Sequence, residues 1–281
     1  EAGREILRKG GSAADAAIAV QMVLGLVEPQ SSGLGGGAFI VHWNNADRAV
    51  TTFDGRETAP ASATPSRFLD HEGAPIAFDT AVRSGLSVGV PGVLRALELA
   101  HEKYGKLPWK DLFEPARKLA RDGFTVGVRL NALLKIEGPD RFSRMARDYF
   151  FDEAGAPRAV GSLLRNPAYD ATLARIADEG AGAFYEGDIA QGIVEAVAQA
   201  PFAPGGLTAD DLRGYTAKER EAACFAYRGR KICGMAAPSS GTLTVGQTLK
   251  LIEPLGGIGG PNARMSPQAV HLIAEAQKLA F

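Results

Sequence analysis

A glycine-rich segment, SSGLGGGAF at residues 31–39, limits the folds open to this chain more than any other stretch. Glycines of a dinucleotide or P-loop site follow a strand and open a helix, so that the helix N-terminus meets the phosphates. Here the order is reversed, because a helical pattern precedes the glycines and the β-rich AFIVHW follows them. No Gly-Lys-Ser/Thr sequence is present either. The segment therefore predicts a connection from a helix to a strand rather than a nucleotide site.

The rest of the chain predicts a helix-rich α+β protein with two strand pairs. Ser12 and Asp15 have the spacing of a capping box at the start of an apolar helix. The first hairpin is expected around the turn Asn44–Asp47, and the second over residues 221–235. Helices are expected at residues 2–9, 13–27, 92–104, 109–121, 127–136, 167–179, 187–199, 208–213, 241–253 and 266–281.

The only two cysteines of the chain lie in the second hairpin. A two-residue turn at Arg228 and Gly229 places Cys224 opposite Cys233. This register permits a cross-strand disulfide, but two small thiols that face the core are the interpretation we favour. We expect no metal site, because no set of residues has the spacing of metal ligands.

The composition argues against several classes of partner. The 281 residues carry a net charge of −1, which gives no electrostatic case for nucleic acid or an anionic membrane surface. No apolar run reaches the roughly 18–20 residues that span a bilayer, and the best candidate, residues 13–27, contains Asp15. Because the chain begins and ends within helical patterns, we interpret it as a fragment or one subunit of something larger.

One serine matches a motif of serine hydrolases. GLSVG at residues 85–89 fits Gly-x-Ser-x-Gly, with Ser87 in the place of the nucleophile. That motif needs a strand before the serine and a helix directly after it, whereas Pro91 breaks the pattern four residues later. We interpret Ser87 as structural; a triad with His101 and His271 stays open as the alternative.

A single arginine is the best candidate for a binding residue. Arg56 lies in DGRETAP, directly after a predicted strand. The planar guanidinium group binds carboxylates through two parallel hydrogen bonds, which a lysine cannot do. By itself the motif is also compatible with a surface ion pair to Asp54 or Glu57.

Taken together, these segments resemble the gamma-glutamyltranspeptidase family. The blocks GGSAADAAIA, EPQSSGLGGGAFIVH, DGRETAP, EPARKLARDGF, GAFYEGDIAQGIV and YRGRKICGMAAPSSGTLTVGQTLKLIE occur in the family's order, and the resemblance covers the whole chain. It implies a layered α+β fold, the αββα sandwich of the N-terminal-nucleophile hydrolase type. Residues 1–281 would then be a single incomplete domain, the helix-rich large-subunit part.

The resemblance also implies an activity. Members cleave gamma-glutamyl amides such as glutathione and transfer the gamma-glutamyl group to water, an amino acid or a peptide. The nucleophile is a threonine, freed by self-cleavage at the start of the small subunit. We therefore expect no catalytic residue in this chain, no activity of the chain alone, no metal or organic cofactor, and the protein's own small subunit as partner. Arg56 matches the family's arginine that binds the substrate α-carboxylate.

Two departures and two alternatives accompany the resemblance. Ser12 stands where the family usually has Asn, and Ala236, Ala237 and Thr242 interrupt its usual PPPSSGG. The alternatives are an amide hydrolase on the same fold, similar to the acylases of glutaryl-cephalosporins, and a non-catalytic homologue. The resemblance implies a periplasmic or secreted protein. It also suggests that backbone packs close to the glycine loop, so that an alanine at Gly36 would harm folding before substrate binding.

Overall fold

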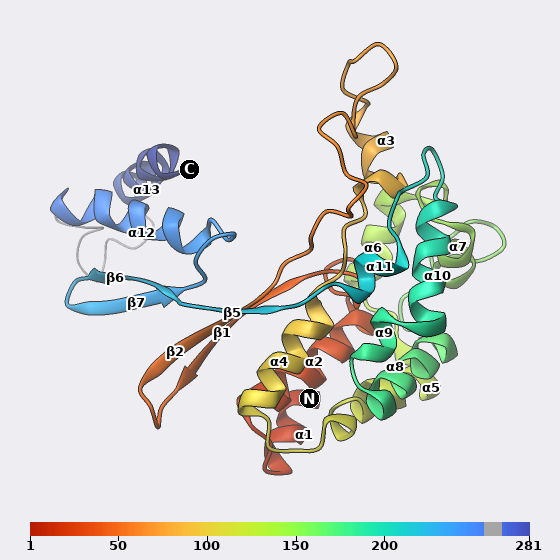
Figure 1. Cartoon of the computed structure of the whole chain (residues 1–281), viewed down its shortest axis with the longest axis horizontal. Coiled ribbons are helices and arrows are strands. Elements are labelled where there is room, and N and C mark those ends of the chain that lie inside the picture. The colour runs from red at the N-terminus through yellow and green to blue at the C-terminus, as the bar shows by residue number, and fades with distance from the viewer. Residues whose placement is uncertain (256–265) are drawn as a thin grey trace. The chain divides into compact units, whose positions relative to one another are not determined.

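The computed structural model describes residues 1–255 and 266–281, which divide into two compact units (Figure 1). The first unit holds Glu1–Gly37 and Glu57–Thr216, and the second holds Ala38–Arg56 and Ala217–Phe281. Elements of the first unit are α1 (Ala2–Arg8), α2 (Ala13–Val27), α3 (Phe78–Val82), η1 (Gly85–Ser87), α4 (Val93–Tyr104), η2 (Trp109–Leu112), α5 (Glu114–Asp122), β3 (Phe124–Thr125), α6 (Val128–Glu137), η3 (Pro139–Arg141), α7 (Arg144–Phe150), β4 (Leu163–Leu164), α8 (Pro167–Glu179), α9 (Gly182–Tyr185), α10 (Gly187–Ala198) and α11 (Ala209–Arg213). Those of the second are β1 (Ala38–Asn44), β2 (Ala49–Gly55), β5 (Lys218–Arg220), β6 (Ala223–Tyr227), β7 (Arg230–Gly234), α12 (Gly241–Ile252), η4 (Glu253–Leu255) and α13 (Pro267–Ala280).

The predicted capping box opens α2 and is also a tertiary anchor. Asp15 N donates to Ser12 Oγ at 3.1 Å, and Ser12 N donates to Asp15 Oδ2 at 2.8 Å. The Asp15 side chain is fully buried, and its Oδ2 also accepts hydrogen bonds from Lys106 N and Leu107 N at 3.0 and 3.2 Å. A buried carboxylate needs such donors, because removing it from water is costly. The same group thus caps α2 and holds the loop after α4.

The core of the first unit is formed by helices packed around α2, α5 and α8. One buried cluster joins α2 and α5 to the short pair β3–β4 and to α6. Its buried members are Leu26, Ala120, Phe124, Val126, Leu130, Leu134, Phe151 and Leu164. Strands of two residues lack a detectable alternation of apolar side chains, so β3 and β4 were not predictable from periodicity.

The second unit contains a sheet with the order β1–β2–β5. β1 and β2 form the predicted hairpin, with registers running from Ala38↔Gly55 to Asn44↔Ala49. β5 pairs with the other edge of β2, where Thr52 lies opposite Arg220. The sequence Lys-Glu-Arg of β5 has no apolar residue and was not predicted as a strand. Its pairing with β2 is what the local pattern could not reveal.

The second hairpin, β6–β7, has the predicted register, with Cys224 opposite Cys233. The two cysteines form a disulfide, so our preference for free, core-facing thiols was wrong. The reason is the face on which they lie. Phe225 packs against α12, where a Cβ on Gly246 would lie 3.0 Å from its ring, and neighbouring strand residues point to opposite faces. Cys224 therefore faces away from α12 and is exposed.

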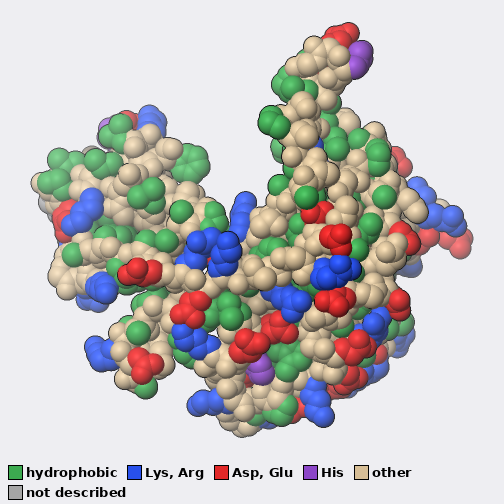
Figure 2. Space-filling view, viewed as in Figure 1, with side chains coloured by type: hydrophobic (Ala, Val, Ile, Leu, Met, Phe, Trp, Pro, Cys, Tyr) green, Lys and Arg blue, Asp and Glu red, His purple; other side chains and the backbone are tan. Residues whose placement is uncertain are grey.

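Large apolar side chains remain exposed on the second unit. Leu243 and Val245 on α12 are 65% and 50% exposed, and Leu279 on α13 is 78% exposed. Figure 2 shows hydrophobic side chains spread over the region of α12 and α13. An apolar surface of this kind is typical of a region that contacts another polypeptide.

Backbone lies close to the glycine loop before β1, as expected, but not where it would exclude a Cβ from Gly35 or Gly36. A Cβ on Gly36 would meet only Glu57 Oε1, at 3.8 Å, and a Cβ on Gly35 would meet nothing within 4 Å. Neither glycine has a positive φ. Gly36 O accepts hydrogen bonds from Gly92 N and Val93 N, but any residue provides that carbonyl. The expectation of a steric need at Gly36 was therefore wrong for the described residues.

Close backbone packing occurs instead at Gly85, the first glycine of the serine motif. A Cβ on Gly85 would lie 2.3 Å from Gly205 N and 2.4 Å from Val197 O. A Cβ on Gly205 would lie 2.2 Å from Gly85 O, and the two segments are joined by the bond from Gly85 N to Ala203 O. Both positions require glycine because backbone cannot move aside as a side chain can.

We predict that Gly85→Ala lowers the free energy of unfolding by about 1–3 kcal/mol, as overpacking in a tight core does. Gly36→Ala is the matched control and should change it by less than about 0.5 kcal/mol. Urea denaturation of the full protein that carries this chain measures both. Equal effects of the two substitutions would contradict the assignment of the tight contact to Gly85.

Candidate functional site

Arg56, the predicted binding residue, directly follows the last residue of β2 and is exposed. Its position depends on Asp54, which is 6% exposed. Asp54 Oδ1 accepts a hydrogen bond from Arg56 N at 2.9 Å, and Asp54 Oδ2 accepts one from Arg220 Nε at 2.6 Å. The buried carboxylate thus ties the backbone of Arg56 to the neighbouring strand β5.

The backbone of β5 is fixed by a second contact in the same place. Thr52 Oγ1 donates to Arg220 O at 2.7 Å, and these two residues lie opposite each other in the pairing of β2 with β5. Because side chains alternate along a strand, Lys218 and Arg220 share the face of Thr52 and Asp54. Arg220 offsets the charge of Asp54, and Lys218 lies opposite Asp54 on β5. Guanidinium and ammonium groups at the end of this strand pair are donors suited to an anionic group.

Local sequence patterns did not identify Lys218 and Arg220 as members of the site. The separation of Arg220 from Asp54 is 166 residues, and β5 has no alternating pattern that would have predicted its register. The only local signal is the pair of cations in Lys-Glu-Arg, which by itself describes any solvated segment. Arg56 was identifiable because it lies in a motif; its supports are brought to it by tertiary structure.

The segment after Arg56 belongs to the first unit and is held at two places there. Thr58 and Val90 form an isolated antiparallel bridge. Ala61 N donates to Asp211 Oδ1 at 2.8 Å, while Thr208 N and Thr208 Oγ1 donate to Asp211 Oδ2 at 2.9 and 2.7 Å. Asp211 therefore caps α11 and also anchors the loop that follows the arginine motif.

These contacts change the pKa of Asp211. Partial burial acts to raise it, but the hydrogen bonds from Ala61 and Thr208 outweigh burial, and the pKa lies below its ordinary value. A carboxylate with a depressed pKa in the folded state stabilises the protein above the pKa of the unfolded chain. That stabilisation is lost as the pH falls through the folded pKa.

Ser87 lies in the 3₁₀ helix η1, with no strand directly before it. Its Oγ donates to Val82 O and Ser84 O, both at 3.0 Å. His101 Nε2 lies 2.9 Å from Leu107 O and 3.6 Å from Asp15 Oδ1, while His271 belongs to the other unit. The geometry of Ser87 agrees with a structural role and lacks the arrangement of a nucleophile elbow.

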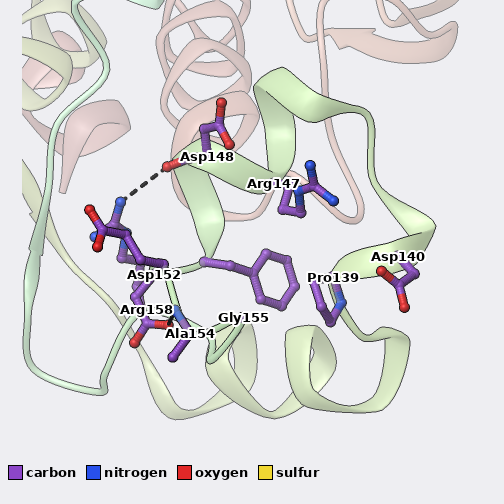
Figure 3. Close-up of a pocket in the computed structure, with 10 residues that line it drawn as sticks. Pro139, Asp140, Arg147, Asp148, Asp152, Ala154, Gly155 and Arg158 are labelled. Atoms are coloured by element: carbon purple, nitrogen blue, oxygen red, sulfur yellow. Dashed lines mark hydrogen bonds between the residues drawn. The ribbon is translucent and has the colours of Figure 1, made fainter.

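A cavity of about 760 Å³ lies in the first unit, beside the turn after α7 (Figure 3). Its polar groups hold the turn together. Asp152 Oδ1 accepts hydrogen bonds from Ala154 N and Ala156 N, and Arg158 donates to Tyr149 O and Asp148 O. Charges of both signs line it, with Arg147 among Asp140, Asp148 and Glu153. We therefore interpret this cavity as a structural hollow.

Neither a metal site nor a membrane-spanning helix is present in the part of the chain that the structure describes. Among these residues no group of three or more His, Cys, Asp or Glu side chains is arranged to hold a metal ion. None of the helices in the same residues combines the length and the apolar character that crossing a bilayer requires.

Comparison with known proteins gives one family for the whole chain. The profile described as Gamma-glutamyltranspeptidase matches residues 1–281. The chain is 37% identical over 288 residues to a glutathione hydrolase proenzyme of Escherichia coli (strain K12), aligning 100% of this chain with 47% of that protein. It thus spans about half the length of the curated relatives that it matches.

Solved structures give the same result. The gamma-glutamyltranspeptidase of Helicobacter pylori superposes with a TM-score of 0.90 and 32% identity, over 99% of this chain and 78% of that one. A cephalosporin acylase from Bacillus halodurans superposes with a TM-score of 0.83 and 26% identity, over 100% of this chain and 51% of that one. The predicted layered α+β fold of the N-terminal-nucleophile hydrolase type is confirmed.

We predict a measurable coupling between Asp54 and Arg220. Removing Arg220 leaves the buried Asp54 carboxylate without its charged neighbour, so the single substitutions should not add in the double variant. Urea denaturation of Asp54→Ala, Arg220→Ala and the double variant should give a coupling energy of about 1–2 kcal/mol, since Arg220 is partly solvated. The exposed pair Asp210–Arg213 is the control, and its coupling energy should be below about 1 kcal/mol. Additive effects at Asp54 and Arg220 would contradict the pairing.

We predict a pH-dependent effect of Asp211→Ala. Near pH 7 the variant should lose about 1 kcal/mol of folding free energy, the usual effect of a lost helix cap. The difference from the unsubstituted protein should shrink as the pH falls below the ordinary aspartate value of 3.8, because protonation then removes the same contribution. Denaturation curves between neutral pH and about pH 3 measure it. A difference independent of pH would contradict the role of the carboxylate.

Proposed function

This chain belongs to the gamma-glutamyltranspeptidase family, and we propose that the protein carrying it cleaves gamma-glutamyl amides such as glutathione. The gamma-glutamyl group then passes to water, an amino acid or a peptide. The match of the family profile to all of residues 1–281 carries this proposal. The structure also supports the proposal, because Asp54 holds the backbone of Arg56 at the end of β2.

In the proposed reaction, the small subunit supplies the nucleophile and this chain binds the substrate. A threonine at the start of the small subunit, activated by its own amine, attacks the gamma-glutamyl carbonyl carbon. The amine of the substrate leaves with a proton, and an ester of the gamma-glutamyl group remains on the threonine. Water or an amine then attacks that ester and regenerates the hydroxyl. This chain contributes recognition of the substrate.

Arg56 is the residue that we assign to recognition. Its guanidinium group would bind the α-carboxylate of the gamma-glutamyl group through two parallel hydrogen bonds. Two observations support this role: the backbone of Arg56 is fixed by a buried carboxylate, and Lys218 on the adjacent strand adds positive charge. Asp54 and Arg220 are positioning residues in this proposal, since they act through the backbone of Arg56.

We propose that residues 1–281 form one incomplete domain, completed by the small subunit of the same protein. The exposed apolar side chains of α12 and α13 support a polypeptide partner for the second unit. The E. coli relative is named as a proenzyme, which also agrees with a precursor that is processed into subunits.

A second candidate function is an acylase of glutaryl amides. The similarity to a cephalosporin acylase at a TM-score of 0.83 favours it. A glutaryl group has the same carbon chain and terminal carboxylate as a gamma-glutamyl group and lacks only the α-amine, so Arg56 could serve both substrates. Relative rates on gamma-glutamyl-p-nitroanilide and glutaryl-p-nitroanilide distinguish the two functions. If the protein turns over neither substrate, the remaining alternative is a non-catalytic homologue.

We predict that Arg56→Ala in the full protein lowers kcat/KM for gamma-glutamyl-p-nitroanilide by at least about tenfold, because a charge-assisted hydrogen-bonded pair contributes about 1.5–3 kcal/mol. Arg56→Lys should be impaired less, since it keeps the charge without the fork. Steady-state kinetics measure both, with Arg213→Ala as the control for loss of a surface arginine.

A second substrate makes the assignment specific. 4-Aminobutyryl-p-nitroanilide keeps the amine and the scissile amide but has no α-carboxylate. The kcat/KM for this slow substrate should change less than about twofold in Arg56→Ala, because the substrate has no carboxylate for Arg56 to bind. An equal loss on both substrates would show that Arg56 supports the fold or the chemistry rather than the carboxylate.

A further inference from the structure

A second cavity, of about 750 Å³, lies within the second unit and contains the disulfide. Its walls include Val41 and Trp43 of β1, and Cys224 and Cys233 of the second hairpin. Nothing in the proposed cleavage of gamma-glutamyl amides uses these residues. The proposed cleavage therefore does not account for this cavity.

The disulfide is accessible from this cavity because of strand alternation. Phe225 faces α12, so Cys224 and Cys233 lie on the opposite face of the β6–β7 hairpin. Cys224 is exposed and Cys233 is half-buried. A nucleophile in solution therefore has a path to Cys224 Sγ, whereas a structural disulfide is ordinarily protected by burial.

The charges around the disulfide favour an anionic nucleophile. Lys231 precedes Cys233 by two residues, so both lie on the same face of β7. Arg48, over the ring of Trp43 at 6.0 Å, also lines the cavity. Against these two cations, the described residues of the lining include one carboxylate, Glu221. Cations near a disulfide attract an anionic thiol and stabilise the thiolate that leaves.

We propose that the Cys224–Cys233 disulfide is a thiol-exchange site for small anionic thiols such as glutathione. The thiolate sulfur attacks Cys224 Sγ, the Sγ–Sγ bond breaks, and its electron pair leaves on Cys233 Sγ. The product is a mixed disulfide at Cys224 and a thiolate at Cys233 that takes a proton from water. This first step changes no overall oxidation state.

A second thiol completes the reduction. Its thiolate attacks the small-molecule sulfur of the mixed disulfide, releases Cys224 as a thiolate and leaves as the small-molecule disulfide. Two small thiols are then oxidised and one protein disulfide is reduced, which balances two electrons. The exchange needs no amide cleavage, so it does not depend on the proposed function.

Peptide mapping by mass spectrometry, after quenching with an alkylating agent, tests the site in the full, folded protein. N-acetylcysteine serves as the anionic thiol and cysteamine as the cationic one, with rates compared at equal thiolate concentration; neither contains a gamma-glutamyl bond. The first mixed disulfide is expected on Cys224. N-acetylcysteine should react at least about threefold faster than cysteamine after each rate is divided by that of the same thiol with a small uncharged disulfide, because the less acidic thiol is intrinsically the stronger nucleophile. Free Cys224 and Cys233 in the native protein, or exchange only after unfolding, would overturn the proposal.

Charge variants test the recognition. Lys231→Ala and Arg48→Ala should each lower the ratio of the two rates at least about twofold, while Glu221→Gln should raise it. Lys278→Ala, on α13 and paired with Glu275, is the matched control and should leave the ratio unchanged. A mixed disulfide formed first on Cys233, or a ratio that no cavity variant moves, would contradict the assigned path.

Discussion

The three-stranded sheet of the second unit depends on its central strand, β2, which is hydrogen-bonded on both of its edges. Its pairing with β1 is local and follows from a four-residue turn, but its pairing with β5 joins segments far apart in the sequence. Two side-chain contacts reinforce that distant pairing: Thr52 Oγ1 to Arg220 O and Arg220 Nε to Asp54 Oδ2. A single edge strand of three charged residues would have little stability without them. The carboxylate that positions Arg56 is therefore also part of what closes the sheet.

The sequence predicted the elements whose signals are local. Long amphipathic or apolar helices such as α2 and α8, the capping box at Ser12, and both hairpin turns are all encoded within a few residues. Short elements such as β3, β5 and α9 arise from tertiary contacts, and propensity in such short stretches carries little information. The alternation of side chains along β6 was detectable, but the face on which α12 packs was not. Because α12 packs on the face of Phe225, the two cysteines lie on the other face and are not buried thiols of the core.

The same distinction applies to glycine. Four glycines between residues 33 and 37 attracted attention because they cluster, yet Gly35 and Gly36 have room for a Cβ. Gly85, the first residue of η1, and Gly205, in a loop, do not belong to such a cluster, yet they are where two backbone segments touch. A steric need for glycine comes from what another part of the chain places beside it, and a cluster in the sequence does not measure that. The serine motif GLSVG is thus partly a packing motif, because its first glycine is required by the segment around Gly205.

In the candidate site, Arg56 was predictable and its environment was not. The contribution of a guanidinium group to binding depends on how well its position is fixed before the ligand arrives. Asp54 fixes the backbone of Arg56, but a buried carboxylate beside a cationic binding site would compete with the substrate carboxylate for that arginine. The bond to Arg220 resolves this conflict, because it gives Asp54 Oδ2 a charged partner of its own. Arg220 thereby balances the charge of Asp54, while Asp54 Oδ1 holds the backbone of Arg56 in place for a second carboxylate.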